Sequence, residues 1–164
     1  MVSGAPTARF ALIDHHGKPA DAATFSGSYL LVYFGFTHCK VVCPRSLAKL
    51  SAVLESLGDL AEKIRPLYIT VDPARDTPEV MRAYLESAHP RFTGLTGSQE
   101  QIDLAKKAFR VFAERRNDAE SPGGYVVPHS AIAYLMAPDG GYLDHFTDSL
   151  EQPEIVRRIS AALH

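Results

Sequence analysis

The chain has 164 residues, of which 46% are hydrophobic and 22% charged, and its formal net charge is −2. These values are ordinary for a globular domain, and we expect residues 1–164 to form a single domain. The charge balance excludes the basic surface of a nucleic-acid-binding protein and a polybasic membrane patch. No run of 18 apolar residues occurs, and the first residues lack the pattern of a signal peptide.

The first half of the chain predicts strands separated by a helix. A short strand over Phe10–Ile13 leads into a polar turn at Asp14–Lys18. The nearly continuous apolar run Tyr29–Gly35 predicts a central strand buried on both faces, and Pro66–Val71 predicts a second one. Between them, leucines recur on one helical face, and Gly58 marks the expected end of that helix. These leucines are Leu47, Leu50, Leu54 and Leu57.

Two further helices are expected to start at capping residues. Thr77 precedes Pro78, a residue favoured at the first helical position, and Ser98 precedes Gln101 with capping-box spacing. Their apolar stripes are Met81, Tyr84, Leu85 and Ala88 in the first helix, and Ile102, Ala105, Phe109 and Phe112 in the second. The polar, glycine-rich residues 117–124 predict an exposed loop.

The last third of the chain predicts a hairpin and a helix. Strands over Ala131–Met136 and Tyr142–Phe146 flank a turn at Pro138–Gly141. A helix is expected to begin near Pro153 and to bury Ile155, Ile159 and Leu163. Alternating strands and helices indicate an α/β fold with a mixed sheet flanked by helices. The order of elements is compatible with a thioredoxin-like fold that ends in a β-hairpin and a helix.

The two cysteines, Cys39 and Cys43, follow directly on the predicted central strand. A close pair in a domain of this size indicates redox or metal chemistry rather than a disulfide scaffold. Because proline is tolerated at a helix start, we expect the next helix to begin at Pro44 with Cys43 as its N-cap. The positive helix end and Lys40 would then favour thiolates. Two buried small side chains, or a structural disulfide, are the alternatives.

Among seven histidines, His129 is the candidate partner of the cysteines. It follows a glycine-containing loop and directly precedes a predicted buried strand. We expect parallel pairing with the central strand to bring it near the cysteine loop. A loop histidine that only forms hydrogen bonds is the alternative. The other six are expected mostly at surface or turn positions, with His38 as a candidate fourth ligand; they are His15, His16, His38, His89, His145 and His164.

Four segments in chain order carry a family resemblance that covers nearly the whole chain. They are Phe34–Cys39 with Cys43-Pro44, Val71–Pro78, Leu95–Gly97, and His129-Ser130 with Tyr134–Met136 and Pro138–Gly140. Together they resemble the Sco/SenC family. Its members are thioredoxin-like, copper-binding proteins that help to assemble the dinuclear copper centre of cytochrome c oxidase.

The resemblance implies that Cys39 and Cys43 are thiolate ligands of one copper ion and that His129 is its imidazole ligand. Soft thiolates suit Cu(I), and imidazole also supports Cu(II). It implies a metallochaperone whose partner is the copper-bearing oxidase subunit or another copper chaperone. It further implies a monomer at the periplasmic or intermembrane-space face, with a membrane anchor outside this chain.

Two departures from the family pattern remove carboxylates near the expected site. Lys40 and Val41 occupy the second and third positions where the family has Cys-Pro-Asp-Val-Cys, and Pro128 replaces an aspartate before the histidine. Groups around a metal site tune its affinity by about 10–100-fold, so we expect the site to persist with an altered copper affinity, redox poise or partner.

In the second signature, we expect Arg75 to pair with Asp72 or Asp76 and to brace the loop. Asp76 itself is interpreted as ordinary helix-start chemistry before Thr77. An alternative function is a thiol-disulfide oxidoreductase, with Cys39 or Cys43 as nucleophile and the other as resolving thiol. A peroxide-reducing enzyme of related fold is a third reading.

Overall fold

A computed structural model describes residues 8–37, 42–111, 116–117, 125–126 and 132–163, with the side chains of 42–43, 116–117 and 125–126 left aside. Its centre is a seven-stranded mixed sheet in the order β2-β1-β5-β4-β3-β8-β9. The strands are β1 (Ala11–Asp14), β2 (Pro19–Asp21), β3 (Tyr29–Gly35), β4 (Ile64–Thr70), β5 (Thr93–Thr96), β8 (Ile132–Met136) and β9 (Tyr142–Thr147). A separate pair joins β6 (Arg116–Asn117) to β7 (Tyr125–Val126).

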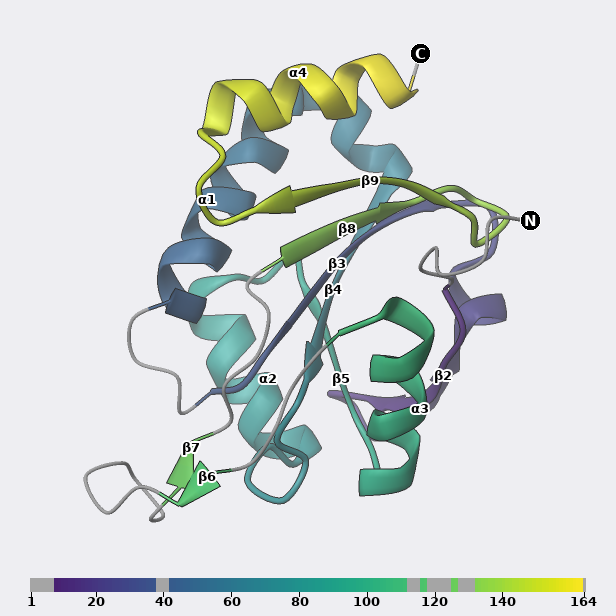
Figure 1. Cartoon of the computed structure of the whole chain (residues 1–164), viewed down its shortest axis with the longest axis vertical. Coiled ribbons are helices and arrows are strands. Elements are labelled where there is room, and N and C mark those ends of the chain that lie inside the picture. The colour runs from purple at the N-terminus through teal and green to yellow at the C-terminus, as the bar shows by residue number, and fades with distance from the viewer. Residues whose placement is uncertain (1–7, 38–41, 112–115, 118–124, 127–131, 164) are drawn as a thin grey trace.

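Helices cover both faces of this sheet (Figure 1). The α-helices are α1 (Val42–Leu57), α2 (Pro78–Ala88), α3 (Gln99–Phe109) and α4 (Gln152–Leu163), with 3-10 turns η1 (Ala22–Phe25) and η2 (Gly58–Lys63). Apolar residues of α1, α2 and α4 pack on one face, and those of α3 pack on the other. The expected α/β, thioredoxin-like arrangement is therefore confirmed.

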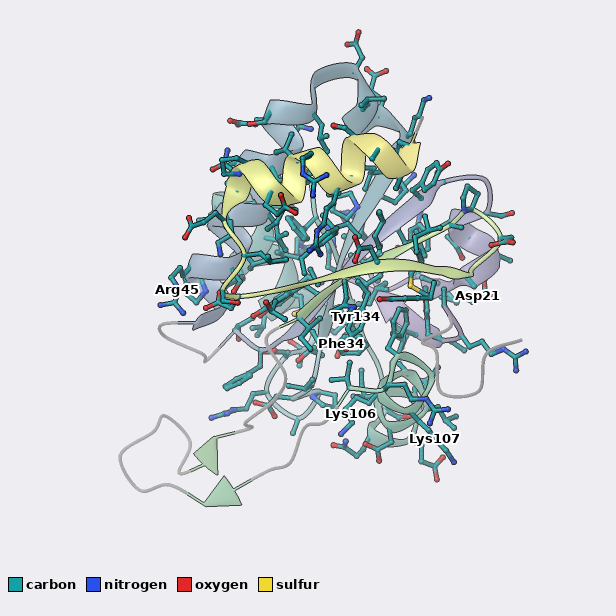
Figure 2. The ribbon with its side chains drawn as sticks, turned by 45° about the horizontal axis from the view of Figure 1, so that its top comes forward. Asp21, Phe34, Arg45, Lys106, Lys107 and Tyr134 are labelled. Carbon is teal, nitrogen blue, oxygen red and sulfur yellow. The ribbon has the colours of Figure 1, made fainter. Side chains whose placement is uncertain are left out.

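The central strand β3 supplies both cores because its successive side chains point to opposite faces. Leu31 and Tyr33 face α1, α2 and α4, whereas Val32 and Phe34 face α3. Phe34 and Tyr134 lie at the centre of the molecule (Figure 2). Phe34 also meets Phe109 of α3 with ring centroids 5.3 Å apart. Burial on both sides explains the unbroken apolar run that predicted this strand.

The helix starts at Thr77 and Ser98 form as their capping residues predict. The Thr77 hydroxyl accepts the backbone N–H of Val80 at 3.3 Å, and Ser98 and Gln101 complete a capping box. The apolar stripes are buried at Met81 and Leu85 in α2, and at Ile102, Ala105 and Phe109 in α3. Tyr84 is half-buried and Ala88 is exposed, so these two do not belong to the buried stripe of α2 as expected. Phe112 lies outside the described residues.

Two strands of the sheet escape prediction because their sequences carry weak signals. β5 contains Gly94, where an added Cβ would lie 2.8 Å from Leu85 Cδ1 of α2. The close approach of helix and strand requires glycine here, although glycine weakens a strand pattern. β2 has three residues and starts with Pro19, which a sheet tolerates at its edge.

The prediction of a loop over residues 117–124 is wrong at its first residue, Asn117. Asn117 pairs with Tyr125 in the small β6–β7 ladder. Strands of two residues are too short to show a periodic pattern in the sequence, so this ladder could not be predicted. Residues 118–124 lie outside the described residues. The hairpin and helix at the end of the chain form as expected, and α4 buries Ile155, Ile159 and Leu163.

Candidate functional site

Cys43 lies inside the first turn of α1, whereas we expected it to be the N-cap of this helix. The helix begins at Val42 rather than at Pro44, so Cys43 is its second residue. The first four N–H groups of a helix have no intrahelical acceptor, and proline therefore costs nothing in the first turn. Cys43 therefore stays in the first turn, at the positive end of the helix dipole.

The other two expected ligands, Cys39 and His129, lie outside the described residues, as do His38, Lys40, Val41 and Pro128. Their ligand roles therefore stay predictions. The described elements on either side of them fix where their segments attach to the sheet. Cys39 follows the end of β3 by four residues, and His129 precedes the start of β8 by three.

The ends of β3 and β8 meet at one edge of the sheet. β8 runs antiparallel to β3, with Ala133 opposite Tyr33. The expected parallel pairing is wrong, and it would have placed the start of β8 at the opposite end of β3. We call residues 38–43, which contain both cysteines, the cysteine segment. The antiparallel pairing attaches the residues that precede Ile132 to the same end of the sheet at which β3 leads into this segment.

Asp76 connects the end of β3 to the second signature segment. Its carboxylate accepts the N–H of Thr37 at Oδ2 (3.0 Å) and the Thr37 hydroxyl at Oδ1 (2.5 Å). The Thr70 hydroxyl also donates to Oδ2, at 2.7 Å. Burial raises the pKa of Asp76 above its ordinary value, and the hydrogen bonds from Thr37 and Thr70 oppose that rise.

The interpretation of Asp76 as ordinary helix-start chemistry missed this role. Thr77 supplies the capping oxygen of α2, so Asp76 is free to face inward, where it is fully buried. A carboxylate placed next to a complete N-cap is the signal in the sequence that could have revealed it.

Arg75 braces the same segment through Asp72. Its Nε lies 2.5 Å from Asp72 Oδ2, which confirms the expected ion pair and selects Asp72 over Asp76. The guanidinium carbon lies 5.9 Å from the ring centroid of Phe36, one residue before Thr37. The pair is largely buried and lies against the residues that lead into the cysteine segment.

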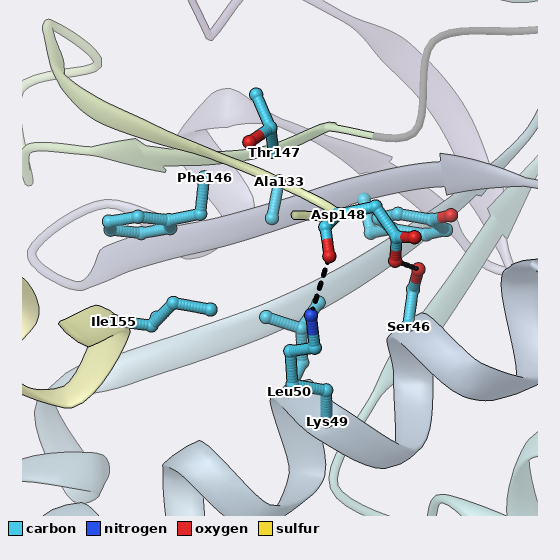
Figure 3. Close-up of a pocket in the computed structure, with 9 residues that line it drawn as sticks. Ser46, Lys49, Leu50, Ala133, Phe146, Thr147, Asp148 and Ile155 are labelled. Atoms are coloured by element: carbon cyan, nitrogen blue, oxygen red, sulfur yellow. Dashed lines mark hydrogen bonds between the residues drawn. The ribbon is translucent and has the colours of Figure 1, made fainter. Parts of the chain in front are cut away.

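Asp148 holds the start of α1 from the other side. It follows β9 directly and accepts hydrogen bonds from Arg45 (2.6 Å) and Ser46 (3.0 Å). Lys49 donates to the Asp148 carbonyl oxygen at 2.7 Å, as Figure 3 shows. Burial opposes ionisation, but the partners Ser46, Arg45 and Lys49 lower the pKa of Asp148 overall. The helix that carries Cys43 is thereby fixed to the hairpin.

The pocket beside this contact is too small for an organic ligand. Its cavity measures about 20 Å³, room for about one water molecule, and it lies between α1, the hairpin and Ile155 of α4 (Figure 3). Small-molecule sites usually need about 300–1,000 Å³. A cavity of about 240 Å³ near Phe25 and Leu30 lies where β3 begins, away from the cysteine segment.

Four histidines lie within the part of the chain that the structure describes: His15, His16, His89 and His145. His15 lies in the expected turn and is buried there, and its Nδ1 accepts the N–H of Gly94 at 2.8 Å. His89 ends α2 with its Nδ1 3.0 Å from the Ser51 hydroxyl, and His145 is exposed on β9. Within the part of the chain that the structure describes, no three His, Cys, Asp or Glu side chains form a metal cluster.

No helix within the described residues is both long and apolar enough to cross a membrane. The described surroundings of the cysteine segment thus consist of the helix start at Cys43, the β3–β8 edge, and two carboxylate anchors. Asp76 forms one anchor at Thr37, and Asp148 forms the other at α1. These features lie at the carboxyl end of the central strand β3, where open α/β sheets place their ligand sites.

Comparisons with known proteins agree with this architecture. The chain is 43% identical over 161 residues to the mitochondrial SCO2 homolog of Mus musculus, covering 94% of this chain and 62% of that protein. It is 42% identical over 137 residues to an SCO2-like protein of Rickettsia felis, covering 84% of this chain and 67% of that protein. The chain therefore spans about two thirds of the length of these relatives.

Solved structures match over most of the chain. The copper-bound structure of Bradyrhizobium japonicum ScoI has a TM-score of 0.85 and 35% identity, covering 96% of this chain and 99% of that one. Copper-bound yeast Sco1 has a TM-score of 0.86 and 34% identity, covering 96% and 87%. The family model described as SCO1/SenC matches residues 3–164. The chain belongs to the SCO1/SenC family.

Proposed function

We propose that this chain is a copper-binding metallochaperone that serves assembly of the dinuclear copper centre of cytochrome c oxidase. Cys39, Cys43 and His129 hold one copper ion in this proposal. Membership of the family and the copper-bound structures of similar proteins support it. Two thiolates and one imidazole form a donor set that suits both Cu(I) and Cu(II).

The antiparallel pairing of β3 and β8 is the observation that carries the ligand set. Cys39 is four residues from the end of β3, and His129 is three residues from the start of β8. An extended chain spans at most about 3.6 Å per residue, so each ligand lies within about 14 Å of the same sheet edge. Cys43 enters from the first turn of α1, whose start is fixed to the hairpin by Asp148.

Copper titration tests the ligand set. The reduced protein should bind one equivalent of Cu(I) and one of Cu(II), measured against a competing chelator. His129→Ala should weaken Cu(II) binding, and Cys39→Ser should abolish stoichiometric binding of both ions. His145→Ala is the matched control, since His145 is exposed on β9. Binding that is indifferent to the three proposed ligands would overturn the proposal.

The protein that receives the copper and the cellular location of the transfer belong to the same proposal. The domain would act at the periplasmic or intermembrane-space face and would deliver copper as a monomer. Its acceptor would be the copper-bearing oxidase subunit or another copper chaperone. Transfer of copper from the loaded protein to the isolated apo-subunit, followed by the acceptor's absorption spectrum, tests this step.

A second candidate function is a thiol-disulfide oxidoreductase that uses Cys39 and Cys43. The position of Cys43 in the first turn of α1 favours it, because a helix N-terminus lowers the pKa of a thiol there. This function predicts a measurable dithiol reduction potential and a reductase activity that His129→Ala leaves unchanged. A peroxide turnover assay tests the third reading, a peroxide-reducing enzyme.

A further inference from the structure

We infer that Asp76 is a positioning residue for the cysteine segment: its buried carboxylate fixes Thr37, two residues before Cys39, in the orientation that copper binding requires. This inference rests on the proposed copper function. In this inference Asp76 acts through Thr37, whose backbone N–H and hydroxyl both donate to its carboxylate.

The contact between Asp76 and Thr37 fixes orientation as well as distance. Two different donors of Thr37 reach the two different oxygens of one carboxylate, the backbone N–H at 3.0 Å and the hydroxyl at 2.5 Å. A single hydrogen bond would leave the peptide free to rotate about it. Two parallel bonds to a planar acceptor remove that freedom, as in other bidentate pairs.

Asp76 is itself held from two neighbouring strands. The hydroxyl of Thr70, the last residue of β4, donates to its Oδ2 at 2.7 Å. The hydroxyl of Thr96, the last residue of β5, donates to its backbone carbonyl at 2.7 Å. Both the side chain and the backbone of Asp76 are therefore hydrogen-bonded to the sheet. Through Asp76, β4 and β5 help to fix the position of Thr37, in addition to the end of β3 that precedes it.

Stability alone does not explain a carboxylate at this place. Asp76 is fully buried, and the neighbouring cation Arg75 forms its ion pair with Asp72. Burying a carboxylate costs free energy unless several hydrogen bonds offset the loss of water. Thr77 already caps α2, so helix formation does not need Asp76. The side chain of Asp76 accepts two hydrogen bonds from Thr37, and these connect it to the residues that lead into the cysteine segment.

A matched pair of variants separates positioning from general stability. Thr37→Val and Thr70→Val each remove one hydroxyl that donates to the same carboxylate, but only Thr37 leads into the cysteine segment. We expect Thr37→Val to weaken Cu(II) binding by about 10-fold or more, in the range found for groups that orient metal ligands. Thr70→Val should keep Cu(II) affinity within about 3-fold of wild type.

Two substitutions of Asp76 test whether its hydrogen bonds or its charge matter. In Asp76→Asn, the amide oxygen can accept the Thr37 N–H and the amide NH₂ can donate to the Thr37 hydroxyl, which rotates to accept. We therefore expect Asp76→Asn to keep copper affinity and the copper absorption spectrum close to wild type. Asp76→Ala should lose at least 10-fold in affinity. An asparagine variant as weak as the alanine variant would overturn the inference.

A metal-free readout distinguishes failure of this inference from failure of the proposed function. Hydrogen exchange at the Thr37 amide of the apo protein should be slow in wild type and Asp76→Asn, and faster in Asp76→Ala, while amides of β4 stay protected. If wild type binds no copper, the proposed function fails while this exchange result still tests the anchor. Equal copper loss in Thr37→Val and Thr70→Val, or unchanged Thr37 exchange in Asp76→Ala, would overturn the positioning role.

Discussion

Tyr33 of β3 lies directly opposite Ala133 of β8 in an antiparallel pair. This relationship determines which segments meet at the functional edge of the sheet. β3 ends two residues after Tyr33 and leads into the cysteine segment, while β8 begins one residue before Ala133. The end of β3 and the start of β8, which are 97 residues apart in sequence, are thereby joined at one edge of the sheet by backbone hydrogen bonds.

Loss of the Asp148 anchor should destabilise the protein modestly. Asp148→Ala removes hydrogen bonds to Arg45 and Ser46, and we expect the free energy of unfolding to fall by about 1–2 kcal/mol. The value is at the low end for charged hydrogen bonds because Arg45 is largely exposed. Urea denaturation measures it. Glu86→Ala, which removes the exposed pair with Arg82, is the control and should change stability by less than about 0.5 kcal/mol.

Two leucines, one on α2 and one on α3, should respond very differently to truncation. Leu85 of α2 is fully buried, whereas Leu104 of α3 is 66% exposed. Leu85→Ala removes packed methyl groups and leaves a cavity, and we expect it to lower the free energy of unfolding by about 2–5 kcal/mol. Leu104→Ala should stay within about 0.5 kcal/mol of wild type. Similar losses at both positions in urea denaturation would contradict the assignment of the core.

His15 should make stability depend on pH between about pH 7 and pH 5. Burial, followed by the charge of His16, lowers the pKa of His15 below its ordinary value of 6.5, and Asp14 and Glu86 oppose that shift. The neutral ring accepts the Gly94 N–H, which a protonated Nδ1 cannot do. The contribution of His15 is therefore fully present above pH 6.5 and is lost as pH falls through the lowered pKa.

The variant His15→Asn keeps an acceptor near Gly94 but does not titrate in this range. Urea denaturation at pH 7, 6 and 5 should show wild type losing stability relative to His15→Asn as the pH falls. A difference between the two proteins that stays constant over this range would contradict the role of His15.

The sequence predicted the elements that bury continuous or regularly spaced apolar residues. Tyr29–Gly35 matches β3 at both ends, because a strand buried on both faces carries its signal in every residue. The capped starts of α2 and α3 follow from local chemistry that needs no tertiary information. β5 could not be predicted in this way, because Gly94 is required by the close packing of Leu85.

Long-range geometry is what the sequence could not supply for the candidate site. The cysteine segment and its helix could be located from residue types, but the direction of β8 relative to β3 depends on the path of the whole chain. The inward position of Asp76 also depends on hydrogen bonds to residues that lie 39 and 20 positions away, Thr37 and Thr96. The ligand roles of Cys39, Cys43 and His129 stay predictions.

The absorption spectrum of the Cu(II)-loaded protein tests the central claim most directly. A copper ion bound by Cys39 and Cys43 should give a thiolate-to-Cu(II) charge-transfer band at one copper per chain. The band should disappear in Cys39→Ser and Cys43→Ser, change in His129→Ala, and persist in the exposed-histidine control His145→Ala. A band absent from the wild-type protein, or one that survives loss of either cysteine, would contradict the proposed copper site.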